Sequence, residues 1–296
     1  MSNHHRAGTL SSADTLVTVT PEQAGWTYCG LEVFDLGTVA PVSRALEGVE
    51  GVLVPLSARD VGVTVDGVTH TLRGRSGVFD AVSDWIYLPV GSEVTIHAAE
   101  GEVALCTARA TERHPVRVTA AADVPVEVRG GGRASRQVTN IATPDSFTGA
   151  DRVNVCEVLT PGGNVSSWPP HRHDGIGDCA PTNEEIYYFR TGRLDGPHGH
   201  PHGQGLFRVY TVDGTSDETV TVLDGDVHLV AQGYHGPSTA QPEYPMYFLN
   251  VLAGPGAERT MAFCDDPDHH WIREAWEAQG QDPRLPMTSA SGRVTR

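Results

Sequence analysis

The chain has 296 residues, of which 39% are hydrophobic, and its formal net charge is −16 at pH 7. This length suits one large or two ordinary domains, and the apolar content is sufficient for buried cores. The negative charge argues against nucleic acid or an anionic membrane as a general partner, because both select proteins with a basic face. A small anionic substrate stays compatible with it, since a single local arginine binds a carboxylate.

Location and redox state are indicated by the N-terminus and the cysteines. Residues 1–16 are polar and lack the apolar segment of a signal peptide, and no apolar run reaches the length that spans a bilayer. Five cysteines are widely scattered, without a Cys-x-x-Cys spacing: Cys29, Cys106, Cys156, Cys179 and Cys264. An odd number of separated cysteines is typical of reduced thiols, so we predict a cytoplasmic protein.

Short β-branched runs separated by turns dominate the chain, which contains 33 Gly and 20 Pro. In residues 63–72 an Asp-Gly pair separates two alternating runs, which predicts a β-hairpin. Residues 43–49 suggest a short turn of helix. Residues 268–280 follow Asp-Asp-Pro and end at a glycine, which predicts a capped helix. Many short strands at regular spacing favour an all-β fold of barrels or sandwiches.

A division into two halves is suggested by three consecutive glycines, residues 130–132, which are flanked by arginines. We expect a bent crossing between residues 115 and 132, and hence domains of residues 1–125 and 126–296. Residues 86–94 and 228–236 share one pattern, a strand, a tight glycine turn and a returning strand. This similarity suggests that the two halves are related β-barrels.

Two histidines one residue apart, His171 and His173, follow a Pro-Pro pair. In a strand, positions i and i+2 share a face. A lone pair of this kind in a chain with 14 histidines is more often a surface feature, so the surroundings decide its meaning. Glu185 begins an aromatic strand, and His235 follows a glycine turn. Three imidazoles and one carboxylate suit a divalent metal with open coordination positions. The first half lacks such a pair, so we predict its barrel to be metal-free.

Adjacent strand residues face opposite ways, so only one of Glu184 and Glu185 can join this group. Glu185 shares its face with Tyr187 and Phe189, where an unpaired carboxylate is costly to bury. We therefore predict Glu185 as the ligand. Glu184 is expected to point into solvent or a salt bridge.

Several blocks between Arg136 and Ile272 resemble one known family: "SSWPPHRHD", "EEIYYF", "FRVYT", "GYHG", "YFLNVLAGP" and "DPDHHWI". They resemble the 5-deoxy-glucuronate isomerases of myo-inositol breakdown, which are bicupin proteins of the cupin superfamily. The resemblance implies an all-β fold of two cupin-type barrels, to which the sequence adds the short C-terminal helix. It also implies a divalent metal, zinc or manganese before iron or nickel, held by His171, His173, Glu185 and His235.

The same resemblance implies conversion of 5-deoxy-D-glucuronate to 5-dehydro-2-deoxy-D-gluconate, an aldose–ketose isomerisation. Such a reaction moves a proton between adjacent carbons, and a divalent metal acts as a Lewis acid on the carbonyl oxygen. The sequence leaves the general base open among four residues: Tyr187, Tyr247, Asp174 and Glu185. For the substrate carboxylate, Arg208 is the first candidate and Arg136 the second.

The sequence leaves alternative functions open, and it leaves the role of one further segment undecided. The related 4-deoxy-5-hexosulose-uronate isomerases of pectin degradation, a metal-dependent cupin dioxygenase and a non-enzymatic sugar-binding cupin are the alternatives. Residues 193–205 look like an insertion that carries three histidines, His198, His200 and His202. The surrounding glycines and prolines favour a solvated loop over a second metal site. The sequence does not determine whether the protein is a homo-oligomer.

Overall fold

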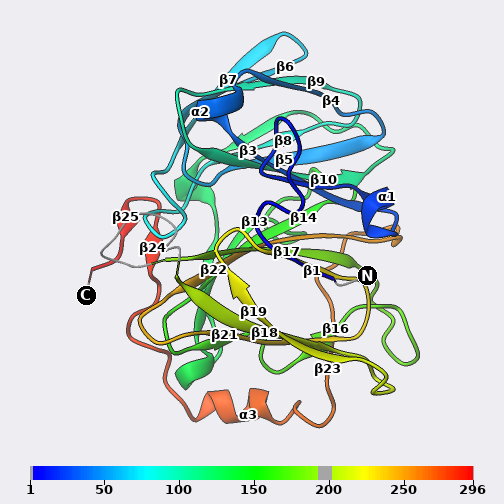
Figure 1. Ribbon diagram of the computed structural model, residues 1–296, viewed down its shortest axis with the longest axis vertical. Helices are drawn as coiled ribbons and strands as arrows, with labels where there is room; N and C mark the ends of the chain where they lie inside the picture. The colour runs from blue at the N-terminus through cyan, green and yellow to red at the C-terminus, as the bar shows by residue number, and fades with distance from the viewer. Residues whose placement is uncertain (1–2, 193–201, 296) are drawn as a thin grey trace.

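Two β-barrels stacked along the long axis make up the described residues, 3–192 and 202–295, of a computed structural model (Figure 1). The helices among these residues are short: α1 (Pro21–Ala24), α2 (Leu36–Val39) and α3 (Ile272–Glu277). The predicted all-β architecture of two barrels with a short C-terminal helix is confirmed. No helix in this part of the chain is long and apolar enough to cross a membrane.

The N-terminal barrel consists of two sheets that enclose an aliphatic core. The six-stranded sheet has the order β11 (Arg117–Thr119), β8 (Trp85–Leu88), β5 (Val49–Pro55), β10 (Glu102–Arg109), β3 (Cys29–Asp35) and β2 (Val17–Val19). The four-stranded sheet has the order β4 (Val42–Ala45), β9 (Glu93–His97), β6 (Arg59–Val65) and β7 (Val68–Gly74). Leu53, Ile86 and Ile96 are among the fully buried side chains between these sheets.

The local predictions for this half are partly correct. The β6–β7 hairpin is confirmed, and its turn residues Asp66 and Gly67 both have positive φ, as a two-residue turn of this kind requires. The helical turn expected at residues 43–49 is wrong, because Val42–Ala45 form strand β4, which pairs with β9. Pairing and the burial of Val42 outweigh a weak local helix propensity.

The C-terminal barrel encloses a more aromatic core. Its seven-stranded sheet has the order β1 (His4–His5), β20 (Val227–Val230), β17 (Glu184–Thr191), β22 (Met246–Ala253), β14 (Asn154–Thr160), β13 (Arg136–Ala142) and β12 (Val126–Arg129). Its facing sheet has the order β19 (Asp217–Leu223), β18 (Gln204–Tyr210), β21 (Tyr234–Ala240), β16 (His171–Arg172) and β23 (Cys264–Asp265), and β15 (Val165–Ser166) also pairs with β21. Tyr187, Phe189, Phe207 and Phe248 pack between the sheets.

The chain changes barrels between β11, which pairs with β8, and β12, which pairs with β13. Residues 120–125 make this crossing. The glycine-rich segment 130–132 was expected to form it but instead joins β12 to β13 within one sheet, and Gly130 and Gly132 have the positive φ of a tight connection. Strand β1 pairs with β20, so the first described residues belong to the C-terminal barrel's sheet.

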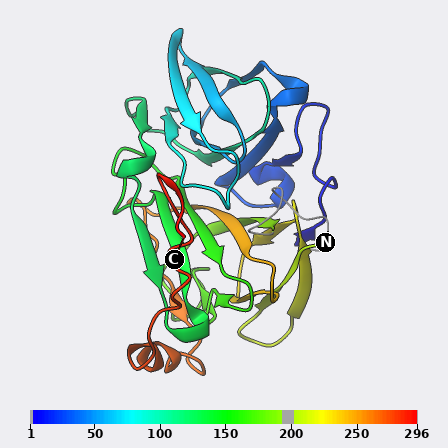
Figure 2. The same ribbon diagram turned by 90° about the vertical axis from the view of Figure 1, so that its left-hand side faces the viewer.

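The two chain ends therefore bridge the barrels. The C-terminal strands β24 (Thr288–Ser289) and β25 (Gly292–Arg293) form a small hairpin, and Arg293 donates to Asp80 of the N-terminal half. The end of the chain runs alongside both barrels (Figure 2).

Two carboxylates, the buried Glu157 and the half-buried Glu184, hold the barrels together. Glu157 accepts hydrogen bonds from Arg75 and from the Tyr247 hydroxyl, and all three side chains are buried. Glu184 accepts three backbone N–H groups, those of residues 27–29, at 2.6 to 2.9 Å. The expectation that Glu184 points into solvent or a salt bridge is therefore wrong. Its carboxylate fixes the N-terminal half against the strand that carries Glu185.

The helix expected at residues 268–280 is shorter than predicted, since α3 covers only Ile272–Glu277. The Asp266 carboxylate accepts the N–H of Asp268 and forms a local turn instead of a helix cap. Trp271, at the start of α3, makes no side-chain capping bond. The helix lies at the end of the C-terminal barrel, beneath its sheets (Figure 1).

Candidate active site

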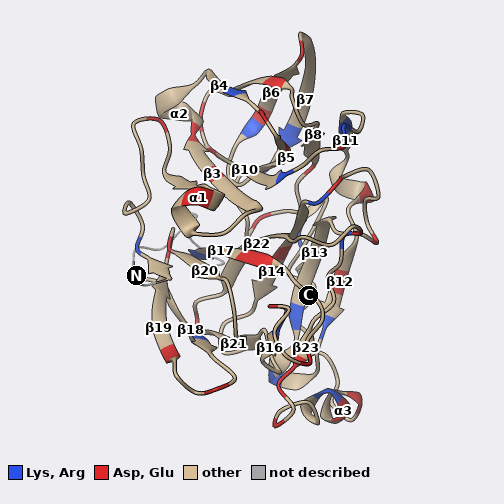
Figure 3. Ribbon diagram, turned by 90° about the vertical axis from the view of Figure 1, so that its right-hand side faces the viewer, with Lys and Arg blue, Asp and Glu red and all other residues tan. Residues whose placement is uncertain are grey.

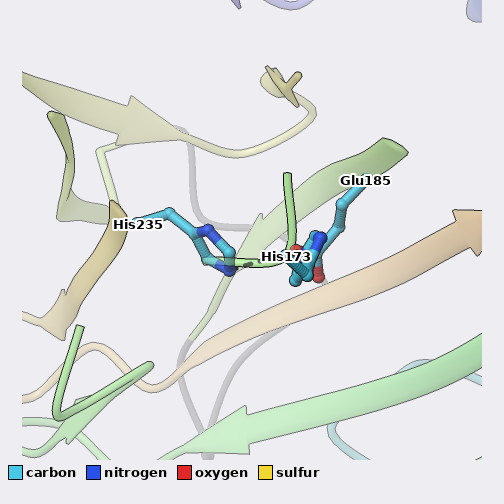
Figure 4. Close-up of side chains that lie close together, drawn as sticks. All are labelled: His173, Glu185 and His235. Atoms are coloured by element: carbon cyan, nitrogen blue, oxygen red, sulfur yellow. Dashed lines mark hydrogen bonds and ion pairs between the residues drawn. The ribbon is translucent and has the colours of Figure 1, made fainter. Parts of the chain in front are cut away.

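The two sheets of the C-terminal barrel bring the predicted ligands together. Glu185 lies near the start of β17 in the seven-stranded sheet. His171 on β16 is the register partner of His235 on β21 in the facing sheet, and His173 follows β16 directly. Figure 4 shows the side chains of His173, Glu185 and His235 converging from separate elements.

Short distances connect these groups. His173 Nε2 lies 2.9 Å and His235 Nε2 3.2 Å from the same carboxylate oxygen, Glu185 Oε2. Candidate ligand atoms of these three residues all lie within 4.8 Å of one another. The His171 ring is adjacent, with its centroid 4.4 Å from that of His235. The structure therefore brings together all four residues that the sequence singled out.

The second nitrogens of two of these rings are anchored by backbone carbonyl groups. His173 Nδ1 lies 2.9 Å from Asn183 O, and His171 Nδ1 lies 3.2 Å from Pro169 O. A carbonyl accepts a hydrogen bond, so each Nδ1 carries a proton and Nε2 is the nitrogen that would bind a cation, which at His173 would replace the contact with Glu185 Oε2. Within residues 3–192 and 202–295, neither nitrogen of the fully buried His235 makes a well-formed hydrogen bond, although its Nε2 lies near Glu185.

Burial and mutual contacts set the protonation of this group. Burial opposes charge on Glu185, but His235 and His173 outweigh it and hold the pKa of this carboxyl far below its usual range. Burial lowers the pKa of His235 and, more strongly, that of His171, which keeps these two rings neutral. Burial also opposes charge on His173, but the hydrogen bond to Glu185 outweighs it and raises the pKa of this ring. An ionised carboxylate beside neutral imidazoles is the form that binds a metal. A buried imidazole without a hydrogen-bond partner also fits this use, so the donor set suits a divalent cation.

A cavity of about 370 Å³ opens beside these ligands. His171, His173 and Glu185 form part of its wall. Aromatic and apolar groups contribute further wall: Trp168, Tyr187, Phe248, Met261, Phe263 and Trp276. Its polar lining includes three arginines and two amides: Arg129, Arg136, Arg273, Asn140 and Asn250. The cavity is thus suited to a small polar anion that reaches the metal ligands.

A family model described as KduI/IolB matches residues 4–272 of this chain. The chain belongs to this family. The resemblance inferred from the sequence blocks is therefore confirmed.

Curated members of the KduI/IolB family with similar sequences are named 5-deoxy-glucuronate isomerase. The one from Geobacillus kaustophilus is 39% identical over 265 residues, which cover 88% of this chain and 91% of the relative. The one from Halalkalibacterium halodurans is 38% identical over 273 residues, which cover 90% of this chain and 96% of the relative.

Solved structures support the fold. The crystal structure of an IolB-like protein from Salmonella typhimurium has a TM-score of 0.81 and 33% identity, and the match covers 91% of this chain and 98% of that one. Oxalate decarboxylase of Bacillus subtilis has a TM-score of 0.59 with 13% identity, over 90% of this chain and 80% of that one. This second likeness concerns the fold alone, and it confirms the predicted pair of cupin-type barrels.

Two residues predicted for catalysis or substrate binding do not reach the cavity of this KduI/IolB protein. The Arg208 guanidinium donates two hydrogen bonds to Asp217 on the neighbouring strand and stacks on Tyr210. Arg208 lies on the face of β18 opposite to the buried Phe207, and this face is outside the barrel interior. The Tyr247 hydroxyl donates to Glu157 at 2.9 Å in the contact between the barrels. Tyr187 and Arg136 do line the cavity.

Several residues of the cavity were missed by sequence reasoning. Asn250 is the one polar side chain in the apolar run 246–253, and that isolation was a usable signal. Arg273 and Trp276 come from α3, a helix whose packing the sequence does not reveal. Arg129 reaches the cavity from the edge strand β12.

The cysteine prediction needs one correction. Cys179 and Cys264 form a disulfide, with Cα atoms 5.8 Å apart and 85 residues between them in sequence. It joins the loop that precedes the Glu185 strand to β23, the strand that pairs with β16. Cys29, Cys106 and Cys156 are free and buried. A pairing over such a separation depends on the barrel fold, so spacing along the chain gave no sign of it.

The histidine-containing insertion is only partly visible. His198 and His200 lie outside the described residues. His202 is exposed at the start of the following segment.

Proposed function

We propose that this chain converts 5-deoxy-D-glucuronate to 5-dehydro-2-deoxy-D-gluconate in myo-inositol catabolism, in a reaction that depends on a divalent metal. One observation carries this proposal: a single cavity joins the His/Glu group to Arg136, a partly buried arginine that has no acidic partner among the described residues. A substrate with a carbonyl at one end and a carboxylate at the other matches these two features.

His171, His173, Glu185 and His235 would hold the metal, for which zinc and manganese are the first candidates and iron or nickel the next. When bound there, a divalent cation supplies Lewis-acid stabilisation of the negative charge that develops on the substrate carbonyl oxygen. The carbonyl groups of Pro169 and Asn183 orient two of the imidazoles for this purpose.

Arg136 is proposed to bind the substrate carboxylate. Its only protein hydrogen bond among the described residues is to the Ala134 carbonyl at 3.2 Å, and it lies over the Trp276 ring. Burial, together with Arg129 and Arg273, lowers the pKa of Arg136 to about 10, so it stays charged at neutral pH. A buried cation without a counter-ion is unfavourable, and a carboxylate that accepts two N–H groups corrects this.

Basic positions on β12, β13 and α3 lie on the same side of the barrel (Figure 3). Arg129 on β12 and Arg273 on α3 are each partnered, by Glu127 and by Asp265. Because Arg129 and Arg273 already bind carboxylates of the protein, Arg136 is the arginine of this group that we propose for binding the carboxylate of a ligand.

Proton transfer falls to the remaining groups of the cavity. Burial, reinforced by Glu185, raises the pKa of Tyr187 well above its usual value, so this phenol stays protonated and is able to donate a hydrogen bond to a ligand in the cavity. Tyr247 and Asp174 are occupied by Glu157 and by Arg172. The carboxylates that line the cavity are Glu185 and Asp145. We propose that one of these two takes the proton and that Tyr187 positions the oxygen beside it.

The decisive experiment offers metal-loaded, untagged protein two substrates in parallel, 5-deoxy-D-glucuronate and 4-deoxy-5-hexosulose uronate. Products are followed by NMR, oxygen uptake by an electrode and metal content by elemental analysis. Conversion of the first substrate alone, without oxygen uptake and abolished by a chelator, supports the proposal. Conversion of the second substrate favours the pectin-pathway activity, and oxygen consumption favours a dioxygenase.

The role of Arg136 has its own test in steady-state kinetics of Arg136→Lys and Arg136→Leu. The lysine variant keeps the charge but loses the two-pronged geometry, so KM should rise while metal content stays constant. The leucine variant should lose about 1.5–3 kcal/mol of transition-state binding, the range for a hydrogen bond to a charged group. Unchanged kcat/KM in both variants would remove Arg136 from the site.

We also propose a cytoplasmic location, supported by the three free, buried cysteines. Trapping of thiols in freshly lysed cells, followed by mass spectrometry, shows whether Cys179 and Cys264 are paired there.

A further inference from the structure

Asn250 lies at the centre of the seven-stranded sheet, on β22 between β17 and β14 (Figure 1). Its register partners are Tyr187 on β17 and Cys156 on β14. Directly opposed residues of antiparallel strands share a face, so these three side chains form one row across the inner surface of the barrel. All three line the cavity whose wall also includes His171, His173 and Glu185.

The amide of Asn250 is not satisfied by the protein. The residue is 4% exposed, and its Nδ2 makes no hydrogen bond to any residue that the structure describes. The one contact recorded for its Oδ1 is the Cys156 Sγ atom, 4.0 Å away. The amide lies close enough to the Tyr187 hydroxyl to influence the pKa of that phenol, but no hydrogen bond of acceptable geometry joins them. A buried donor without an acceptor is unfavourable, and in a cavity wall it is available to a ligand.

The register places this donor between the two ends of the proposed substrate. Along the sheet, the row of Asn250 is two residues from that of Glu185, which pairs with Leu252. Arg136 lies in the opposite direction along the sheet. Val138 pairs with Val158, which in turn pairs with Phe248, and Arg136 comes two residues before Val138 on the same strand. With a rise of about 3.3 Å per residue, the rows of Glu185 and Arg136 are displaced from that of Asn250 by roughly 7 Å and 13 Å along the strands, in opposite directions. Glu185 lies one strand and Arg136 two strands away from β22.

From this geometry we infer that Asn250 Nδ2 donates a hydrogen bond to a mid-chain oxygen of an open-chain sugar acid. An extended molecule with its carboxylate at Arg136 and its carbonyl end at the His/Glu group passes over this amide. The inference rests on the proposed function for the identity of the substrate, but it requires only a polyhydroxy acid in the cavity. Asn250 is thus a substrate-binding residue that discriminates oxygen-bearing chains from apolar ones.

The test compares Asn250→Leu with Asn154→Leu. Asn154 is also a buried amide with an unsatisfied atom, but it borders a different cavity, so it controls for the loss of an amide from this sheet. Binding of D-gluconate, an open-chain sugar acid without an aldehyde, is measured by calorimetry beside kcat, KM, metal content and melting temperature. Gluconate reports on Asn250 even if the isomerase assay of the wild-type protein fails.

We expect Asn250→Leu to lose roughly tenfold in gluconate affinity and in kcat/KM, the fold-change of one typical hydrogen bond. Its metal content should equal that of the wild type, and its melting temperature should stay within about 3 °C, because removing an unpaired donor costs no bond. Asn154→Leu should keep wild-type affinity. Asn250→Ser, with a smaller donor, should lie between the wild type and the leucine variant.

The inference is overturned by any of three results. These are wild-type gluconate affinity in Asn250→Leu, loss of metal together with activity in that variant, or an equal loss of affinity in Asn154→Leu. If Asn250→Leu does not fold, Asn250→Ser decides the matter, and unchanged affinity in that variant overturns the inference as well.

Discussion

The N-terminal and C-terminal barrels have similar strands and turns but different interiors. Between its two sheets the N-terminal barrel is filled with aliphatic side chains, and Leu53, Ile86 and Ile96 have no exposed surface. The C-terminal barrel packs a smaller aromatic core and keeps a cavity of about 370 Å³ beside Glu185. A barrel of this type can bind a ligand when its core side chains do not fill the interior and when polar groups that line the remaining cavity have no partner within the protein.

The two strand–turn–strand units that looked alike in sequence illustrate this difference. The unit β8–β9 buries Val94 and Ile96 inside the N-terminal barrel. The unit β20–β21 buries His228 and His235 instead. None of the described histidines of the N-terminal barrel, residues 70, 97 and 114, is fully buried. The backbone pattern is shared, and the side chains that face inward decide the chemistry.

The largest effect should follow from His235→Ala. This change removes a buried candidate ligand, so bound metal should be lost and kcat should fall by more than the 10- to 100-fold that loss of an outer-shell partner typically costs. The fold should persist, because alanine is tolerated in a strand and relieves two unsatisfied nitrogens. Metal analysis and steady-state kinetics provide the measurement.

The control for this change is His97→Ala in the N-terminal barrel, at an exposed position on β9. Full metal content and wild-type kcat are expected there. Metal retained by His235→Ala, or metal lost by His97→Ala, would contradict the assignment of function to the C-terminal barrel.

A cavity made in the filled barrel should act on stability alone. Ile96→Ala removes buried aliphatic surface from a packed core, so the free energy of unfolding should fall by about 2–5 kcal/mol. Urea denaturation measures this loss. Because Ile96 lies far from the ligands in the fold, kcat/KM per folded molecule should not change. A change in kcat/KM would mean that the N-terminal barrel influences the chemistry as well as the packing.

Acid should act through the buried histidines of the C-terminal barrel. Burial, followed by His4 and His235, lowers the pKa of His228 from its ordinary 6.5 to about 3. Between these values the unfolded chain binds a proton that the folded chain does not, so the stability contribution is present above pH 6.5 and lost as pH falls toward 3. At pH 5 the loss from this group is about 2 kcal/mol.

His228→Leu should reduce the difference in unfolding free energy between pH 7 and pH 5 by about this amount. Chelator-treated protein is used, so that release of metal does not contribute. An equal pH dependence in the wild type and His228→Leu would show that His228 titrates normally.

Three kinds of position show which features of the structure could be predicted from the sequence. Alternation and turn chemistry are local, so the β6–β7 hairpin and the choice of Glu185 over Glu184 could be predicted. Contacts between distant segments could not, and these include the Cys179–Cys264 disulfide and the approach of α3 to the cavity. Helix propensity over four to seven residues is too weak a signal, which explains the wrong prediction at residues 43–49.

The smallest effect on stability and KM is expected for a change of Arg208, the first candidate for binding the substrate carboxylate. That prediction depended on how distant strands are arranged, which local sequence patterns do not reveal. Alternation placed Arg208 on one face of its strand, but only the sheet order shows that this face lies away from the ligands. Its partner Asp217 is half-exposed, and exposed pairs of this kind contribute about 0–1 kcal/mol. Arg208→Ala should therefore change the free energy of unfolding by about 0.5 kcal/mol or less and leave KM for the sugar acid unchanged. Urea denaturation and kinetics beside Arg136→Leu measure both quantities.

A rise in KM for Arg208→Ala that matched the rise for Arg136→Leu would contradict this expectation. It would mean that the strand pair β18–β19 closes over the substrate during turnover, and the outer face of the barrel would then belong to the site.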